Sequence, residues 1–78
     1  MILQCYVVKD DLSGYYQYFG NYVNEAVARR AFNEAINAAG VPTTDLMLYH
    51  NGSFDSNTGV FVGFNDPVFI MRGEKTNA

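Results

Sequence analysis

The sequence predicts an α+β fold, a small antiparallel sheet of four to five strands with one helix on one face. Two observations carry this prediction. A five-residue turn pattern, D-x-x-[S/T]-G, occurs at residues 10–14 and again at 55–59, each time after an extended apolar run, and so marks two β-hairpins. Between them, apolar residues recur at three- and four-residue spacing, the period of an amphipathic helix. The predicted order is hairpin, helix, hairpin and a possible edge strand.

The first hairpin is predicted from two runs of β-branched and aromatic residues. Residues 2–8 (ILQCYVV) leave neither face of an extended chain cleanly polar, so this strand is expected at the centre of the sheet. Residues 14–23 (GYYQYFGNYV) have the aromatic content of a second strand. With Phe19 in the core, alternation turns Tyr16 and Tyr18 outward.

The helix is predicted to begin after Asn24 and to end before Gly40. Asn24 is a favoured N-cap, Glu25 complements the positive end of the helix dipole, and Gly40 followed by Pro42 ends the helix. Glu25 and Arg29 have the i,i+4 spacing of an exposed ion pair. The buried face is expected to consist of Ala28, Ala31, Phe32, Ala35, Ile36 and Ala39.

The second hairpin spans residues 45–62. Alternation places Leu46 and Leu48 toward the core. Gly52 is either the second residue of an Asn-Gly turn or a bulge in a longer strand, and the bulge is favoured because a more complete turn follows at 55–59. Residues 60–62 then have the composition of the return strand.

The C-terminal part of the chain predicts one more short strand. Residues 65–67 (NDP) are expected to form a turn, and Pro67 restricts the apolar run 68–71 to an edge position. Residues 73–78 are expected to be a flexible tail. The whole chain, residues 1–78, is expected to be a single domain, since so short a chain has material for one core.

Composition narrows the classes of function. Eight acidic and five basic side chains leave a net charge of −3, which opposes strong attraction of DNA. The chain lacks an apolar run of 18 residues, and its start, MILQCYVVKDD, has neither the basic residues nor the cleavage site of a signal peptide. We therefore expect no membrane partner and no export. A single cysteine, Cys5, excludes an internal disulfide and fits a reducing compartment, while a lone thiol is also compatible with a disulfide between two chains.

Catalytic and metal chemistry find little support in the sequence. Cys5 and His50 are the only residues of their types, so one chain cannot assemble a zinc site from several nitrogen and sulfur ligands. A Cys-His nucleophilic pair is weighed against the ordinary behaviour of a mid-strand cysteine as a small apolar residue. Asp10 and Asp11 are adjacent and point apart in extended chain. We expect no enzyme, no catalytic residue, no metal and no cofactor.

The aromatic second strand is the most distinctive chemical feature, because cations lie close to it in sequence. Flat rings are surfaces on which unpaired bases stack, and cations contact phosphates. The alternative is that the tyrosines suit a half-buried sheet or a subunit interface. The candidate nucleic-acid-binding residues are Lys9, Tyr15, Tyr16, Tyr18, Tyr22, Arg29 and Arg30.

Three motifs together carry a family resemblance. They are the D-x-x-[S/T]-G turn at 10–14, A-x-R-x-F at 28–32, and L-Y-x-x-G-x-F-D-x-x-T-G at 48–59. In this order the chain resembles the small non-structural protein of gokushoviruses, tailless single-stranded DNA phages of the microvirus group. The resemblance implies a protein made in the cytoplasm of the infected bacterial host, absent from the capsid, and acting in viral DNA replication or DNA binding.

Two hypotheses of function follow. The first is a replication accessory that binds single-stranded DNA weakly or with assistance, through the tyrosine strand and the Arg29 and Arg30 face. The second is an acidic, self-associating adaptor that engages a host or phage replication protein without binding DNA. In both cases we expect a homo-oligomer, in the first instance a dimer, because a domain this small leaves apolar surface and residues 68–71 form an apolar edge.

Overall fold

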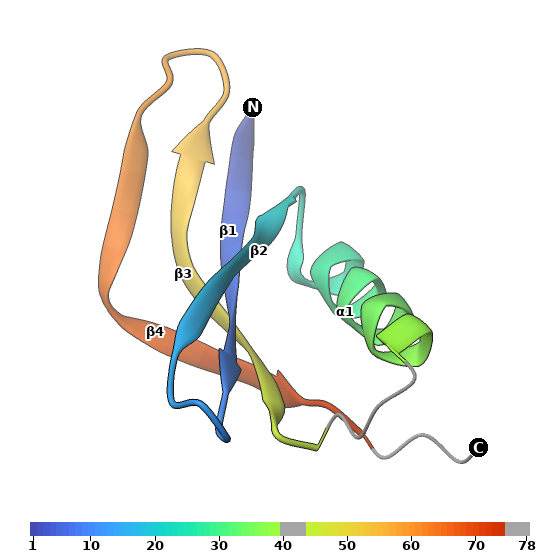
Figure 1. Cartoon of the computed structure of the whole chain (residues 1–78). Helices are drawn as coiled ribbons and strands as arrows, with labels where there is room; N and C mark the ends of the chain where they lie inside the picture. The colour runs from blue at the N-terminus through green and yellow to red at the C-terminus, as the bar shows by residue number, and fades with distance from the viewer. Residues whose placement is uncertain (40–43, 75–78) are drawn as a thin grey trace.

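The computed structural model describes residues 1–39 and 44–74, which form one antiparallel sheet and one helix (Figure 1). Four strands lie in the order β2-β1-β3-β4, which confirms the predicted α+β fold and the central position of the first strand. The elements in chain order are β1 (Ile2–Asp10), β2 (Tyr16–Tyr22), α1 (Glu25–Ala39), β3 (Leu46–Asp55) and β4 (Phe61–Arg72).

The two predicted turns are built alike. In each, the aspartate carboxylate accepts a hydrogen bond from the N–H two residues further on, at 2.9 Å for Asp10 and 2.8 Å for Asp55. The closing glycine donates its N–H to the aspartate carbonyl at 2.7 Å. Gly14 and Gly59 have φ of +80° and +77°, a conformation that glycine adopts without strain. The N–H of Asn57, by bonding the Asp55 carboxylate, lowers the pKa of that group.

The helix begins and packs largely as predicted. Asn24 caps it by accepting a hydrogen bond from the N–H of Val27 at 3.0 Å, and Arg29 pairs with Glu25 at 2.8 Å. Its buried side chains join a core with two sheet residues; the members are Tyr6, Ala28, Phe32, Ile36 and Leu48. Ala35, predicted to be buried, is exposed because it lies at the rim of a hollow between α1 and β2.

The bulge predicted near Gly52 is confirmed. Cys5 pairs with Gly52 and Tyr6 pairs with His50, so Asn51 is an extra residue on β3. On the other side of β3, Gly52 pairs with Gly63 while His50 pairs with the residue at 68. Residues 64–67 of β4 therefore stand opposite Asn51 alone.

This wide bulge corrects the prediction for the C-terminal part of the chain. Residues 65–67 do not end a strand; β4 continues through them from Phe61 to Arg72 and bends sharply about midway (Figure 1). The bulge absorbs the Asn-Asp-Pro sequence, and Pro67 is tolerated because β4 is an edge strand. Gly73, expected to begin a flexible tail, donates its N–H to the Leu46 carbonyl at 2.7 Å. Residues 75–78 of that predicted tail lie outside the described residues.

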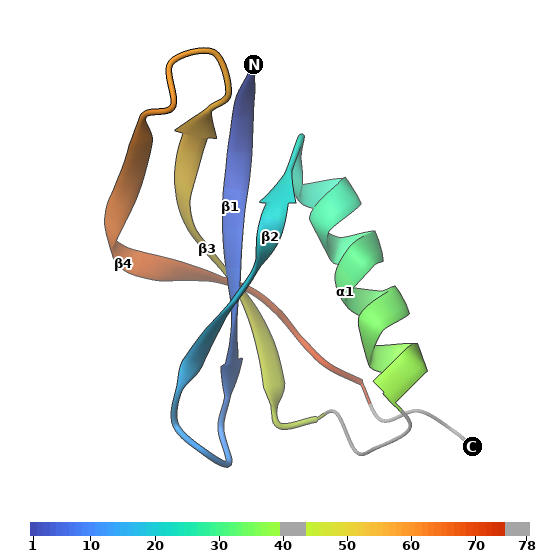
Figure 2. The ribbon, with the colours of Figure 1, turned by 45° about the horizontal axis from the view of Figure 1, so that its top comes forward.

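The helix covers only part of the sheet. It lies beside β2 on one face, while the start of β1 and the hairpin joining β3 to β4 extend beyond it (Figure 2). The molecule is correspondingly elongated, with extents of 43 × 23 × 15 Å. One whole face of the sheet and one end of the other face are therefore without a helix.

Candidate functional site

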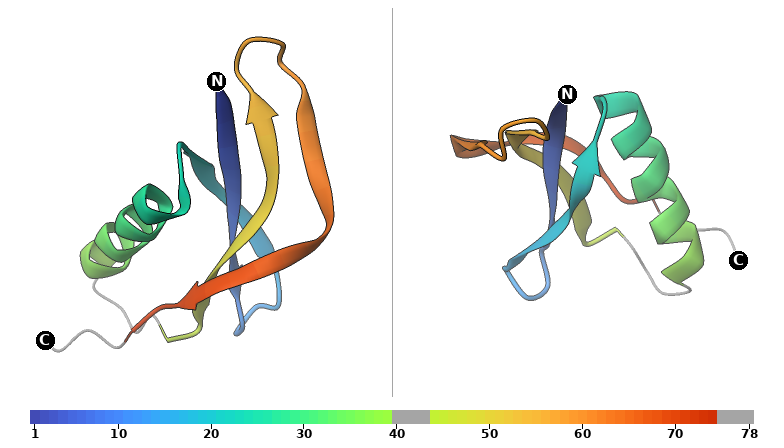
Figure 3. Two further views of the ribbon diagram at one scale, coloured as in Figure 1. Left: turned by 180° about the vertical axis from the view of Figure 1, so that it is seen from behind. Right: turned by 90° about the horizontal axis from the view of Figure 1, so that it is seen from above.

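The sheet face opposite α1 carries two rows of side chains that cross all four strands. The pairing register defines them, because directly paired residues of an antiparallel sheet lie on one face. α1 lies on the other side of the sheet (Figure 3). The first row is Tyr18, Val7, Tyr49 and Phe69; the second is Tyr16, Lys9, Met47 and Arg72.

Three rings in these rows are in edge-to-face contact. The Tyr16 and Tyr49 centroids are 5.4 Å apart, and those of Tyr49 and Phe69 are 5.6 Å apart. The ammonium of Lys9 lies 5.6 Å from the centre of the Tyr16 ring, within range of a cation–π interaction. The rings remain accessible, with 47% of Tyr16, 66% of Tyr18 and 52% of Phe69 exposed. We call Lys9, Tyr16, Tyr18, Tyr49, Phe69 and Arg72 the open-face patch.

The patch also has a structural role. Val7 and Met47 lie between its long side chains and are buried although no helix covers this face. The neighbouring rings must therefore lean over them and keep them from water. The patch therefore takes the place of a helix in covering Val7 and Met47 on this face.

One of the two cations on the patch is held by several contacts. The guanidinium of Arg72 donates to Asp11 at 3.2 Å, to the Thr44 carbonyl at 2.7 Å and to the Met47 sulfur at 3.1 Å. The Asp11 carboxylate offsets part of its charge. The Lys9 ammonium lies over the Tyr16 ring and forms no ion pair with a carboxylate of the described residues.

The candidate nucleic-acid-binding residues predicted from the sequence lie on different surfaces of the structure. Lys9, Tyr16 and Tyr18 come together on the open-face patch. Tyr15 lies at the first turn, 77% exposed, beside a hollow of about 320 Å³. Tyr22, expected at the surface, is half-buried on the helix side of the sheet.

The remaining predicted residues also lie on the helix side. Tyr22 has its ring 5.7 Å from Phe19 and 6.1 Å from Tyr6. Arg29 is bonded to Glu25 and reaches the Ile70 carbonyl at 3.4 Å, while Arg30 is exposed on the helix. The predicted arginine face and the tyrosines of the open-face patch therefore do not form one surface.

Three residues of the open-face patch, Tyr49, Phe69 and Arg72, were not among the binding residues predicted from the sequence. Tyr49 could have been found, because alternation places it opposite Leu46 and Leu48, which face the core. Phe69 and Arg72 could not be found in this way. Their faces depend on a register shift between Leu48 and Tyr49, which only the pairing of β3 with β4 defines.

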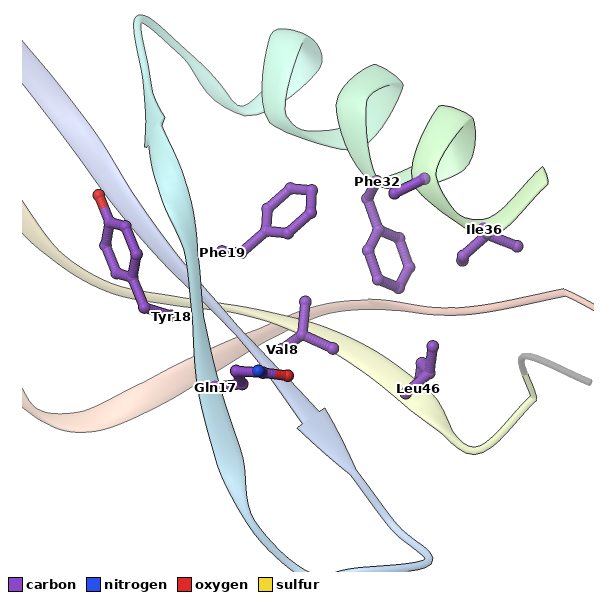
Figure 4. Close-up of a pocket in the computed structure, with 8 residues that line it drawn as sticks. Val8, Gln17, Tyr18, Phe19, Phe32, Ile36 and Leu46 are labelled. Carbon is purple, nitrogen blue, oxygen red and sulfur yellow. The ribbon is translucent and has the colours of Figure 1, made fainter. Parts of the chain in front are cut away.

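A separate hollow of about 210 Å³ opens between α1 and the sheet (Figure 4). Phe32 and Ile36 line it from the helix, and Phe19, Val8 and Leu46 line it from the sheet. The rest of its wall is Gln17, Tyr18 and Ala35. This wall has no charged side chain among the described residues, so it offers no cation to pair with a phosphate.

Cys5 and His50 lie on opposite faces of the sheet. His50 pairs with Tyr6, and their rings stack with centroids 4.9 Å apart. The next residue on the strand, Cys5, points the other way. Burial raises the pKa of the Cys5 thiol, which is 2% exposed. The two side chains therefore do not meet, as a nucleophile and its base must.

We expect Cys5 to react very slowly with a thiol reagent in the folded protein. The thiolate is the reactive form, and burial disfavours it while also blocking access. Labelling with a chromogenic disulfide should be slow in buffer and complete within the mixing time in concentrated urea. Immediate stoichiometric labelling of the folded protein would contradict the placement of Cys5.

Residues 1–39 and 44–74 hold no cluster of three or more His, Cys, Asp or Glu side chains placed to bind a metal ion. Over the same residues no helix has the length and apolar character needed to cross a membrane.

The fold and the patch together define a small α+β protein with one sheet face lined by half-exposed aromatic rings. The residue profile of the family described as Phage ORF5 protein matches residues 3–76, nearly the whole chain. The protein therefore belongs to the phage ORF5 protein family. No curated protein and no solved structure matches it.

Proposed function

We propose that this phage protein is a non-structural accessory of viral DNA replication that binds single-stranded DNA weakly through the open-face patch. Its resemblance to the gokushovirus protein supports a microvirus-type phage and action in the cytoplasm of the infected bacterium. The observation that carries the proposal is the contact of three rings, Tyr16, Tyr49 and Phe69. Tyr16 and Phe69 are about half exposed, and Lys9 lies over the Tyr16 ring.

The chemistry of the patch suits unpaired bases better than duplex DNA. Stacking of a base on an aromatic side chain contributes roughly 1–3 kcal/mol and tolerates any base. Duplex binding depends instead on many phosphate contacts. The patch has two cations, Lys9 and Arg72, and the chain has a net charge of −3. Affinity should therefore come mainly from stacking, and it should be modest.

Removing two rings is expected to abolish most of this affinity. In the double variant Tyr16→Ala with Phe69→Ala, a loss of about 1 kcal/mol per ring would weaken binding about 30-fold. Fluorescence anisotropy of labelled oligo-dT measures it. Tyr15→Ala is the matched control, because it truncates a more exposed tyrosine that lies outside the patch and should change affinity less than twofold. Circular dichroism must show that all variants are folded.

Salt dependence provides a second test of the same site. A single-strand contact contributes about −0.7 to the slope of log affinity against log salt. We expect a shallow slope, reduced further by Lys9→Gln. A steep slope, or an equal loss in Tyr15→Ala, would contradict the proposed patch.

A wild-type protein that does not bind oligo-dT even at low salt would favour the second candidate function. The net charge of −3 is the observation that supports it. In that case the open-face patch would dock a host or phage replication protein, since aromatic residues are enriched at protein interfaces.

A further inference from the structure

The first half of β4 is an edge strand whose side chains are exposed on both faces. β4 is the last strand of the sheet, so one side of its backbone has no strand partner among residues 1–39 and 44–74. Phe61 is 53% exposed, Val62 56% and Phe64 41%, and Val60 just before them is 56% exposed. Four large apolar residues within five positions are unusual on a free edge.

The usual means of protecting an edge strand are missing from this segment. Soluble proteins block free edges with charges, prolines, bulges or a covering element. Residues 60–64 (VFVGF) contain no charge and no proline. The bulge begins only at Phe64, the last residue of the segment, and Asp66 and Pro67 come after it. An uncovered segment of this kind would promote aggregation.

Neither face of the sheet is covered at this segment. Phe61 pairs with Phe54, which pairs with Leu3, on the face opposite α1. Val62 pairs with Ser53 and hence lies on the face that α1 covers further along the sheet. The helix does not extend this far (Figure 2). Both faces therefore lack a cover at the same place.

We propose that residues 60–64, which are Val60 and the first four residues of β4, pair antiparallel with the same residues of a second copy of this chain, across a two-fold axis perpendicular to the sheet. A partner for this edge must bring a strand that is uncharged and apolar on both faces. The segment itself meets both conditions, and an antiparallel two-fold pair brings identical residues together with mutual hydrogen bonding. The product is a continuous sheet of eight strands.

The available area sets the expected strength of this contact. An aromatic side chain buries roughly 150–250 Å² when fully covered. Half-exposed Phe61 and Phe64, with Val60 and Val62, thus offer roughly 300 Å² per copy, against roughly 800 Å² in a standard interface. Backbone hydrogen bonds between the two paired segments add to this contact. We therefore expect a dimer that dissociates in the micromolar range.

The pairing has a consequence for the open-face patch, and this consequence alone rests on the proposed function. A two-fold axis perpendicular to a sheet keeps equivalent faces on the same side. The dimer would then present two patches on one surface, and one strand of DNA could contact both, which raises affinity by effective concentration. Self-association itself does not depend on DNA binding.

Sedimentation equilibrium of the full chain tests the proposal, with micromolar to several hundred micromolar protein. The wild type should sediment at twice the chain mass in the upper part of this range. Val62→Lys should raise the dissociation constant at least tenfold, because pairing would bury two unpaired ammonium groups. Val23→Lys is the matched control: Val23 is 51% exposed, follows β2 at the opposite edge of the sheet, and should leave the dimer unchanged.

Three results would contradict the proposed pairing of two copies. The first is a wild type that keeps the mass of one chain over the whole concentration range. The others are a folded Val62→Lys variant that dimerises like the wild type, and a Val23→Lys variant that loses the dimer to the same extent as Val62→Lys. If Val62→Lys does not fold, Val60→Lys replaces it, since Val60 is equally exposed and outside the strand proper. A wild-type protein that dimerises but does not bind oligo-dT would contradict the proposed function and would still agree with this pairing.

Discussion

Replacing Phe32 with alanine should remove most of the stability of this protein. Phe32 is 1% exposed and contacts the Phe19 ring edge-on at 6.0 Å between centroids. It is the largest side chain that α1 contributes to the core, so its loss leaves a cavity that a single helix cannot close. Truncation of a buried phenylalanine costs about 3–5 kcal/mol. Small domains have little more than that in total.

Urea unfolding followed by circular dichroism measures this effect, with Phe69→Ala as the control. The same atoms are deleted there from a ring that is 52% exposed, so we expect a loss of about 1 kcal/mol or less. Similar losses in the two variants would mean that α1 does not pack on the sheet through Phe32.

Replacing Gly52 with alanine should also destabilise the fold, although alanine is usually more favourable than glycine in a strand. A Cβ atom at Gly52 would lie 2.5 Å from the Val62 carbonyl oxygen and 2.9 Å from the Phe61 ring. Strand propensity alone predicts that Gly52→Ala stabilises the protein. The structure predicts the opposite sign, because the nearest atom is backbone and Gly52 is paired on both sides, with Cys5 and Gly63.

The expected loss for Gly52→Ala is about 1–3 kcal/mol, the range for overpacked sites. In a domain of this size that lowers the melting temperature by roughly 5–20 °C. Gly63→Ala is the control in the facing strand, since the nearest atom to its Cβ is 3.2 Å away in the Phe61 ring, which can yield. A Gly52→Ala variant as stable as the wild type would show that β4 is free to move away from β3.

Local chemistry explains the parts of the fold that were predicted correctly. The turns after Asp10 and Asp55 form because a carboxylate bonds forward to its own backbone and a glycine takes positive φ. The helix start follows from Asn24 in the same way. These interactions span two to four residues, so a short stretch of sequence contains both partners. The phage family was likewise visible in three short motifs.

The errors arose where strands from distant parts of the chain meet. Asn-Asp-Pro has the composition of a turn, yet β4 continues through it because the bulge at Asn51 makes room. Tyr22 and Tyr16 lie in one strand, and a register shift beside Tyr6 and Val7 puts Tyr22 on the helix side. A bulge reverses the face of every residue beyond it. Gly20, next to this bulge in β2, is the one local signal for it, but a glycine alone does not fix where the register shifts.

The candidate site shows the same division. The composition of residues 14–23 indicated a strand rich in aromatic rings, and alternation turned Tyr16 and Tyr18 outward. The neighbours of those rings depend on the pairing of strands that are far apart in the sequence. This pairing places Tyr49 and Phe69 beside Tyr16. Arg29 and Arg30 remain on the helix. Short-range preferences in the sequence determine the helix and the strands. The register between strands determines on which face of the sheet a side chain lies, because that register depends on contacts that no single segment contains.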